Sequence, residues 1–259
     1  MNQPLHAGQQ RLSDCVDMAI TGKADPMAVK RIERETQALL NKGAGQPEIS
    51  WLILAFTAFF QGKASECIRF VEAASKLAPY DVTVVGNAGS LLAGVGEPRR
   101  ASEFVRRQAG MAVDDKRQLL FCSLNFRKVL LFEEAADIMR TYGGAEGEAF
   151  KASAQQLADI ALERGISPDM RMALLEVAIA TVRDQGCSIR HVGLTQYPDN
   201  SLRYVLFIDE SASQCGNVNF AIAEALTEKF EDTHAEFITF ACRPLSSYDV
   251  DGTFIEVAR

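Results

Sequence analysis

The sequence lacks the features that mark secreted proteins, membrane-spanning proteins and the common enzyme classes. Its first ten residues, MNQPLHAGQQ, have neither the charged start nor the apolar core of a signal peptide. The longest apolar run, Trp51 to Phe60, is interrupted by Thr57 and is too short to span a bilayer. The patterns G-x-x-x-x-G-K-[ST], G-x-S-x-G and H-E-x-x-H are absent. We therefore expect a cytoplasmic, non-catalytic protein without a cofactor or a metal and without membrane contact.

Closely paired cysteines are also missing. The chain has six cysteines with no C-x-x-C pair among them: Cys15, Cys67, Cys122, Cys187, Cys215 and Cys242. A disulfide or zinc framework would need closer, paired spacings. The spacing predicts free, buried thiols in a reducing compartment.

The chain has no excess of positive charge either. Lys and Arg number 27 against 34 Asp and Glu, a net charge of −7, and the acidity lies in residues 143–259. An acidic half disfavours a phosphate backbone as its partner, so nucleic acid is unlikely. The basic run Arg99, Arg100, Arg106 and Arg107 is open to two interpretations. We expect a solvated helix face; a nucleic-acid patch would need interleaved aromatic residues, which are missing here.

The sequence does contain an internal repeat with a step of 34 residues. Gly62 recurs 34 residues later as Gly96. Two further sets of residues follow the same step: Phe70, Phe104 and Ile138 form one set, and Cys67, Ala101 and Ala135 form the other. This period is typical of a helix–turn–helix unit, which buries its apolar face only by stacking on a neighbouring unit. The repeat therefore predicts a row of helix pairs.

The first copy of the repeat carries a recognisable residue pattern. Trp51, Leu54, Ala55, Gly62, Ala74 and Pro79 are placed as in W-x2-L-G…A…P. Residues 48–149 therefore resemble three tetratricopeptide repeats, at 48–81, 82–115 and 116–149. The match is imperfect, since Leu130 stands at the turn position of the third copy. The resemblance implies a mostly α fold with a right-handed helical solenoid.

Three further regions flank the repeats. Residues 1–47 are predicted to form a helical cap with helices at 11–20 and 25–41. Residues 150–186 are predicted to form a helix pair, which could be a divergent fourth repeat. From residue 187 the apolar period changes to that of strands. A hairpin, a helix at 217–230 and strands at 236–242 and 253–257 predict a small acidic α+β domain (ββαβ), with one helix covering one sheet.

The resemblance also implies a binding surface. In tetratricopeptide stacks the first helix of each unit lines the concave face, and carrying the ligand-facing positions over selects Phe56, Phe60, Asn87, Arg117, Phe121, Leu124 and Lys128. These residues form an apolar wall, a small-residue floor and a partly basic wall. Such a groove suits an amphipathic helix or an extended peptide with an acidic end. The family's two-carboxylate clamp is incomplete, because Leu52 and Phe56 replace its first Lys and Asn. We expect an adaptor or chaperone-like protein that binds a partner polypeptide.

Three alternatives stay open at this point. The groove could be filled by the protein itself, with the N-terminal helices over Phe56 and Phe60 and the acidic domain against the cations. The C-terminal domain could be a thiol-dependent hydrolase, with Cys215 at a helix start as nucleophile and His234 as base. It could instead be a self-association module that makes a homodimer. Asp209-Glu210 could hold a divalent metal, although a solvated strand end is the simpler interpretation.

Overall fold

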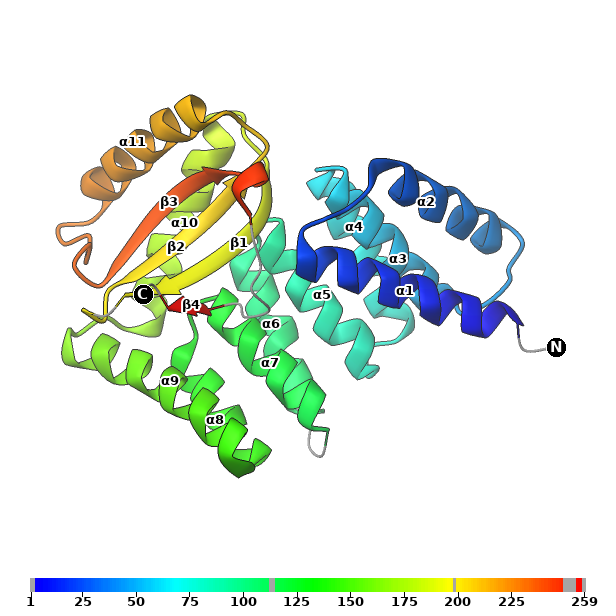
Figure 1. The fold of residues 1–259 in the computed structure, drawn as a ribbon, viewed down its shortest axis with the longest axis horizontal. Coiled ribbons are helices and arrows are strands. Elements are labelled where there is room, and N and C mark those ends of the chain that lie inside the picture. Colours follow the sequence, from blue (N-terminus) through cyan, green and yellow to red (C-terminus); the bar gives the residue numbers. More distant parts are fainter. Residues whose placement is uncertain (1–2, 112–114, 198, 249–254, 258–259) are drawn as a thin grey trace.

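A computed structural model of the chain describes residues 3–111, 115–197, 199–248 and 255–257 of the 259. The molecule is mostly helical, with one small sheet near its C-terminal end (Figure 1). The helices are α1 (Gln3–Thr21), α2 (Pro26–Asn41), α3 (Pro47–Phe60), α4 (Ala64–Leu77), α5 (Val82–Gly94), α6 (Pro98–Ala109), α7 (Lys116–Lys128), α8 (Phe132–Tyr142), α9 (Gly144–Glu163), α10 (Pro168–Asp184) and α11 (Ala212–Lys229). The strands are β1 (Ile189–Gln196), β2 (Leu202–Ile208), β3 (Ile238–Pro244) and β4 (Ile255–Val257), and a 3-10 turn spans Leu245–Ser247.

Capping side chains determine where several helices begin. Asp25 accepts hydrogen bonds from the free backbone N–H groups of α2, and Asp81 and Asp115 do the same for α5 and α7. Asp81 and Asp115 are one repeat step apart, so the same residue type performs the same function in two copies. Ser167 caps α10 and Ser211 caps α11. Because Ser211 caps α11, this helix begins at Ala212, and its predicted start at residue 217 was wrong.

The tight turn within each helix pair is the same in all three copies. Gly62 and Gly96 have φ values of +72° and +78°, a region that glycine enters without steric cost. Leu130 adopts φ of +59° at the third turn, although a non-glycine residue there costs about 1–2 kcal/mol. Its side chain is fully buried, and its carbonyl accepts a hydrogen bond of 2.9 Å from Nε of Arg171. Tertiary contacts therefore stabilise a turn for which the local sequence is unsuited.

The helix pairs pack in two rows. Helices α3, α5 and α7 contact one another in sequence, and each also packs on the following helix of its own pair. Contacts between the second helices recur at a separation of 28 residues, Arg100 with Glu72 and Arg106 with Glu134. Arg107 donates to the carbonyl of Pro79, in the loop after α4. Arg99 pairs with Glu176 of α10. Each arginine of the basic run therefore contacts a neighbouring element of the same chain.

The sheet has the strand order β3-β2-β1-β4. Strands β1 and β2 are antiparallel, which confirms the predicted hairpin, whereas β3 runs parallel to β2 and β4 parallel to β1. Residues 253 and 254 of the predicted last strand lie outside the described part of the chain.

Two helices cover the same face of the sheet, where the sequence predicted one. Helices α10 and α11 share a buried core with Val192 and Leu194 of β1 and with alternate residues of β2 and β3. This core also includes part of α9 and extends across residue 187, where the sequence suggested a boundary. The alternate residues His191 and Gly193 lie on the other face of β1, which contacts α5 and α7.

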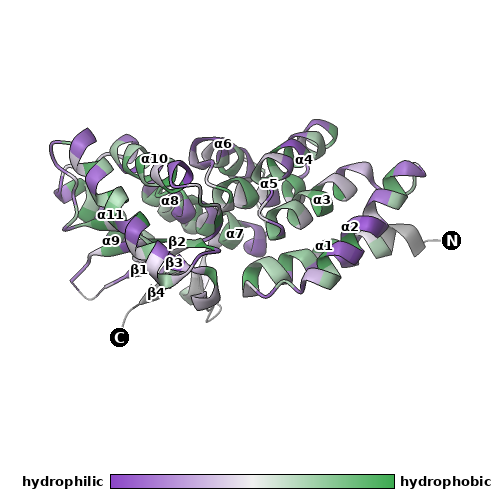
Figure 2. Cartoon of the chain, turned by 90° about the horizontal axis from the view of Figure 1, so that it is seen from above, coloured by the Kyte–Doolittle hydropathy of each residue, from purple (hydrophilic) through white to green (hydrophobic). Residues whose placement is uncertain are grey.

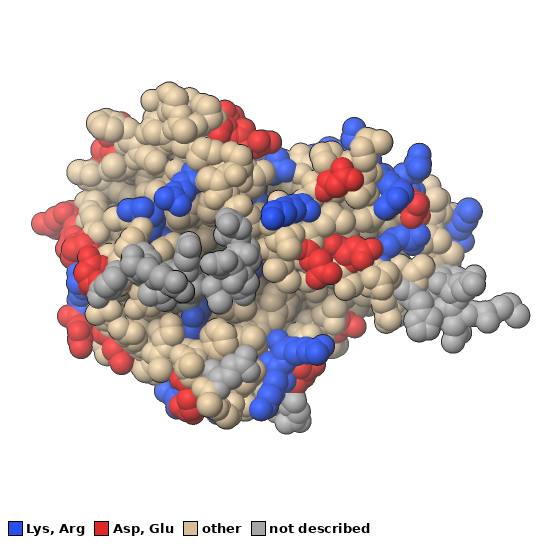
Figure 3. Space-filling view, in the orientation of Figure 1, with Lys and Arg blue, Asp and Glu red and all other residues tan. Residues whose placement is uncertain are grey.

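The molecular surface reflects the charge distribution. In Figure 2, hydrophobic stretches (green) alternate with hydrophilic stretches (purple) along the helices. In Figure 3, acidic side chains gather along the left edge, over the C-terminal half of the chain. Among the described residues, no helix combines the length and the apolar character that a membrane crossing requires.

Candidate functional site

One cavity of about 630 Å³ is lined by residues of α3, α5 and α7. Ligand sites for small molecules typically enclose about 300–1,000 Å³. Six of the seven residues selected from the sequence line this cavity: Phe56, Asn87, Arg117, Phe121, Leu124 and Lys128. The first helices of all three repeat copies thus contribute to one space.

Phe60, the seventh selected residue, is not part of the cavity lining. Its ring packs beside Phe56 and Phe59, with ring centroids 6.1 Å and 5.7 Å away. Its backbone carbonyl accepts a hydrogen bond from Arg190, next to β1 residue His191. Phe60 therefore supports the apolar side of the cavity and helps to attach the C-terminal part of the chain.

Four positions of α7 form a stripe along the cavity. Arg117, Phe121, Leu124 and Lys128 are spaced by four, three and four residues, which places them on one helix face. Arg117 is exposed near the start of α7, whereas Lys128 at its end is only partly accessible. Eleven residues at 1.5 Å per residue separate the two cations by about 16 Å along the helix axis.

Small residues of α5 keep the opposite side of the cavity open. Ser90 and Gly94 line it, and a Cβ added to Gly94 would lie 3.0 Å from the ring of Phe59. Asn87 is nearly buried, and its side-chain amide donates to the carbonyl of Thr83 at 2.8 Å. The predicted small-residue floor is present at these positions.

The two ends of the chain cover the rest of the cavity. Helix α1 contributes Val16, Ala19 and Ile20, while β1 and the segment after the 3-10 turn contribute His191 and Tyr248. The Tyr248 hydroxyl donates to the carbonyl of Ile20 at 3.3 Å. The Tyr248 ring stacks on His191 with centroids 4.1 Å apart. The surface formed by α3, α5 and α7 is therefore partly covered by the protein itself, and a cavity remains.

The polar groups of the lining are cationic or neutral. Lys128 donates from Nζ to Oγ of Ser90 at 2.8 Å, and burial lowers the pKa of Lys128 to about 8. Burial, and next the charge of Lys128, lower the pKa of His191 to about 3, so this imidazole is neutral near pH 7. Arg117 supplies a second positive charge, and Asp and Glu are not among the described lining residues.

Among the residues that the structure describes, the C-terminal half brings no acidic side chain to the cavity lining, and Asp249 and Asp251 lie outside the described part of the chain. This half approaches the cavity with His191, Val192 and Tyr248. Arg127, which precedes Lys128 in α7, is buried and donates to the carbonyl of Phe150 in α9 at 2.6 Å. Burial lowers the pKa of Arg127 to about 10.

The proposed catalytic pair of Cys215 and His234 is not assembled. Cys215 lies in the first turn of α11, and His234 follows the end of this helix. The fourteen residues from Cys215 to Lys229 extend about 21 Å along the helix. Burial also raises the pKa of Cys215, which opposes thiolate formation. All six cysteines are buried and free, as the sequence predicted.

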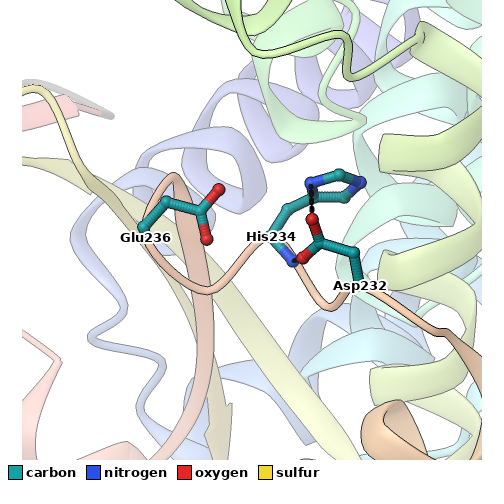
Figure 4. A group of neighbouring side chains, drawn as sticks. All are labelled: Asp232, His234 and Glu236. Atoms are coloured by element: carbon teal, nitrogen blue, oxygen red, sulfur yellow. Dashed lines mark hydrogen bonds and ion pairs between the residues drawn. The ribbon is translucent and has the colours of Figure 1, made fainter.

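Among the described residues, one group has the composition of a metal site. Asp232, His234 and Glu236 can each offer a ligand atom, and these atoms lie within 4.8 Å of one another (Figure 4). Both carboxylates are exposed and have other contacts, Asp232 with Nδ1 of His234 at 3.4 Å and Glu236 with Arg164 at 3.7 Å. Asp209 pairs with Arg190 at 3.4 Å at the exposed end of β2. These contacts account for the acidic groups without a metal.

Sequence reasoning placed the N-terminal helices over Phe56 as one alternative, which the α1 residues in the lining support, but it did not name the lining residues outside the repeats. Val16, Ala19, Ile20, His191 and Tyr248 belong to no repeat copy. Their only local signal was the apolar pattern of the first helix, which does not show what the helix covers. The contact between Ile20 and Tyr248 joins residues 228 positions apart.

Comparisons with protein-family models, with curated proteins and with solved structures gave no match to this chain.

Proposed function

We propose that α3 to α8 are three stacked units of the tetratricopeptide type. The first helices of the pairs end at Phe60, Gly94 and Lys128, one repeat step apart. The second helices begin at Ala64, Pro98 and Phe132, again 34 residues apart. The recurring 28-residue contacts between successive second helices support the same arrangement, because stacked identical units repeat their interface.

The protein functions, in this proposal, as a non-catalytic binding protein that holds a short apolar segment of a partner polypeptide. The observation that carries the proposal is the single cavity to which three repeat copies contribute. Helix α1 and Tyr248 limit the length of chain that fits, so the occupant is a short segment and not a long helix lying through the groove. Phe56, Phe59 and Leu91 offer it an apolar surface, and α7 offers two cations.

Filling the cavity tests this function. Short peptides would be selected from a random library on the immobilised protein, and their affinities measured by fluorescence polarisation. Leu124→Trp places a larger, aromatic side chain in the cavity and should weaken the affinity of the selected peptides at least tenfold. Leu162→Trp is the matched control, because Leu162 is 77% exposed on α9, away from the lining.

Thermal unfolding of both variants shows whether the fold persists. Equal peptide affinity of the wild-type protein and a folded Leu124→Trp variant would show that the cavity is not the binding site. Failure of any peptide to bind the wild-type protein would overturn the proposal as a whole.

A further inference from the structure

Aromatic rings make up a large part of the described lining of this cavity. Helix α3 contributes two rings, and α7, β1 and the segment after the 3-10 turn contribute one each: Phe56, Phe59, Phe121, His191 and Tyr248. These rings come from four separate parts of the chain and meet at one space.

Several of the rings are in contact with one another. The rings of Phe59 and His191 meet edge to face at an interplanar angle of 72°, with centroids 5.7 Å apart. The imidazole of His191 stacks on Tyr248 in turn, and Phe56 and Phe59 both pack beside Phe60. Aromatic pairs in such arrangements attract each other beyond the effect of area burial. These contacts position the rings before any ligand arrives, which lowers the entropic cost of binding.

Two of the rings also lie against glycines of α5. A Cβ added to Gly94 would lie 3.0 Å from the ring of Phe59, and one added to Gly86 would lie 3.1 Å from Cε1 of Phe121. Both distances are shorter than an ordinary carbon–carbon contact of about 3.5–4.0 Å. The absence of a side chain at these two positions lets the rings of α3 and α7 approach the backbone of α5 closely.

A cation lies near one of the rings. Arg117 is exposed at the start of α7 and precedes Phe121 by four residues, so the two side chains are neighbours on one helix face. A guanidinium is attracted to the face of an aromatic ring within about 6 Å, an attraction that a saturated side chain does not offer. The lining therefore favours an aromatic ring over an aliphatic group of the same size.

We propose that the cavity binds one aromatic side chain of the partner polypeptide, inserted among the rings of Phe59, Phe121 and Tyr248. The inference rests on the proposed binding function and adds the chemical class of the residue that anchors the partner. Because Ile20 and Tyr248 meet at the cavity, a single side chain enters more readily than a longer stretch of chain.

The selected peptides test this assignment. Each aromatic residue would be replaced in turn by leucine, and the least tolerant position would then carry either phenylalanine or cyclohexylalanine, which is saturated and similar in size. Since cyclohexylalanine is at least as apolar as phenylalanine, burial alone predicts equal or tighter binding. We expect the cyclohexylalanine peptide to bind the wild-type protein about fivefold or more weakly in fluorescence polarisation. Equal or tighter binding would overturn the inference.

Variants of the lining show whether its rings cause this preference. Phe59→Leu and Phe121→Leu should each reduce the preference for phenylalanine over cyclohexylalanine at least twofold. Phe220→Leu is the matched control, because Phe220 is 71% exposed on α11, outside the lining, and the preference should not change. An unchanged preference in both folded lining variants would contradict the assignment. Should neither variant fold, the two peptides compared on the wild-type protein still decide.

An aromatic ring could also come from a free small molecule. N-acetylphenylalaninamide presents the ring without neighbouring residues, and we expect it to bind at least tenfold more weakly than the phenylalanine peptide. Equal affinity would identify a small aromatic molecule as the ligand and overturn the polypeptide source.

The outcomes separate this inference from the proposed function. If the selected peptides need no aromatic residue but Leu124→Trp still weakens them, the cavity binds its partner without an aromatic anchor and only the inference fails. If Leu124→Trp leaves binding unchanged, the binding function itself fails.

Discussion

Replacing Leu130 with glycine should destabilise the protein, although glycine occupies the matching turn in the other two repeat copies. Repeat similarity alone would suggest the opposite, because φ at Leu130 is +59° and glycine would relieve about 1–2 kcal/mol of backbone strain. The Leu130 side chain, however, is fully buried in the core formed with α9 and α10. Removing a buried Leu side chain costs about 2–5 kcal/mol.

The two effects oppose each other, and the packing term is larger. The net expectation for Leu130→Gly is a loss of about 2 kcal/mol in the free energy of unfolding, the difference between the middle values of the two ranges. Leu130→Ala keeps the strain and also loses the packing, so it should be less stable than Leu130→Gly by about 1 kcal/mol. Urea unfolding followed by far-UV circular dichroism measures both differences.

The variant Gly43→Ala measures the backbone strain of a non-glycine residue at positive φ separately from any packing effect. Gly43 has φ of +60°, and a Cβ added there meets no atom within 4 Å. We expect this variant to lose about 1 kcal/mol through strain alone. If Gly43→Ala shows this loss while Leu130→Gly equals or exceeds the wild-type stability, the packing around Leu130 contributes less than the strain, and the reasoning is refuted.

Three further predictions concern single side chains. Arg171→Met should lower the free energy of unfolding by about 3–5 kcal/mol in urea titrations, since Arg171 is fully buried and bonds the carbonyls of Leu130 and Ile166 and the carboxylate of Glu133; a loss below 1 kcal/mol would contradict its structural role. His191 has a pKa of about 3 in the folded protein against about 6.5 unfolded, so the unfolded chain takes up its proton first as the pH falls. Relative to His191→Phe, the wild-type protein should lose about 2 kcal/mol of stability between pH 6.5 and 5, and parallel pH profiles would disprove this. Cys215 should react with iodoacetamide at least tenfold more slowly than free cysteine at pH 7.5, because it is buried and its pKa is raised; a faster rate would reopen the thiol-enzyme hypothesis.

Much of the helical part of the fold could be predicted from local sequence. The capping residues Asp25 and Ser167 predict the starts of α2 and α10, and the 34-residue step locates the three helix pairs. The spacing 117, 121, 124 and 128 puts four side chains on one face of α7 wherever that helix lies. These features depend on backbone geometry and on neighbours within one or two turns.

Other features could not be predicted in this way. The turn at Leu130 has no local signal, since the side chains of Arg171 and its neighbours stabilise it from α10. The proposed pairing of Cys215 with His234 is not formed because Cys215 lies in the first turn of α11 and His234 follows its end, so the length of the helix separates them. Helix α10 covers the sheet because its apolar residues share a core with β1 and β2. The apolar periodicity of a helix shows which of its faces is buried, but not which element packs against that face.

The sequence by itself determined the helix pairs, their period and which side chains share one face of α7. Only the tertiary structure decided that residues of α3, α5 and α7 line a cavity of about 630 Å³. The reason is that Ile20 and Tyr248, from opposite ends of the chain, meet across it. Such a contact depends on how whole units pack, whereas the helices depend on residues three and four positions apart.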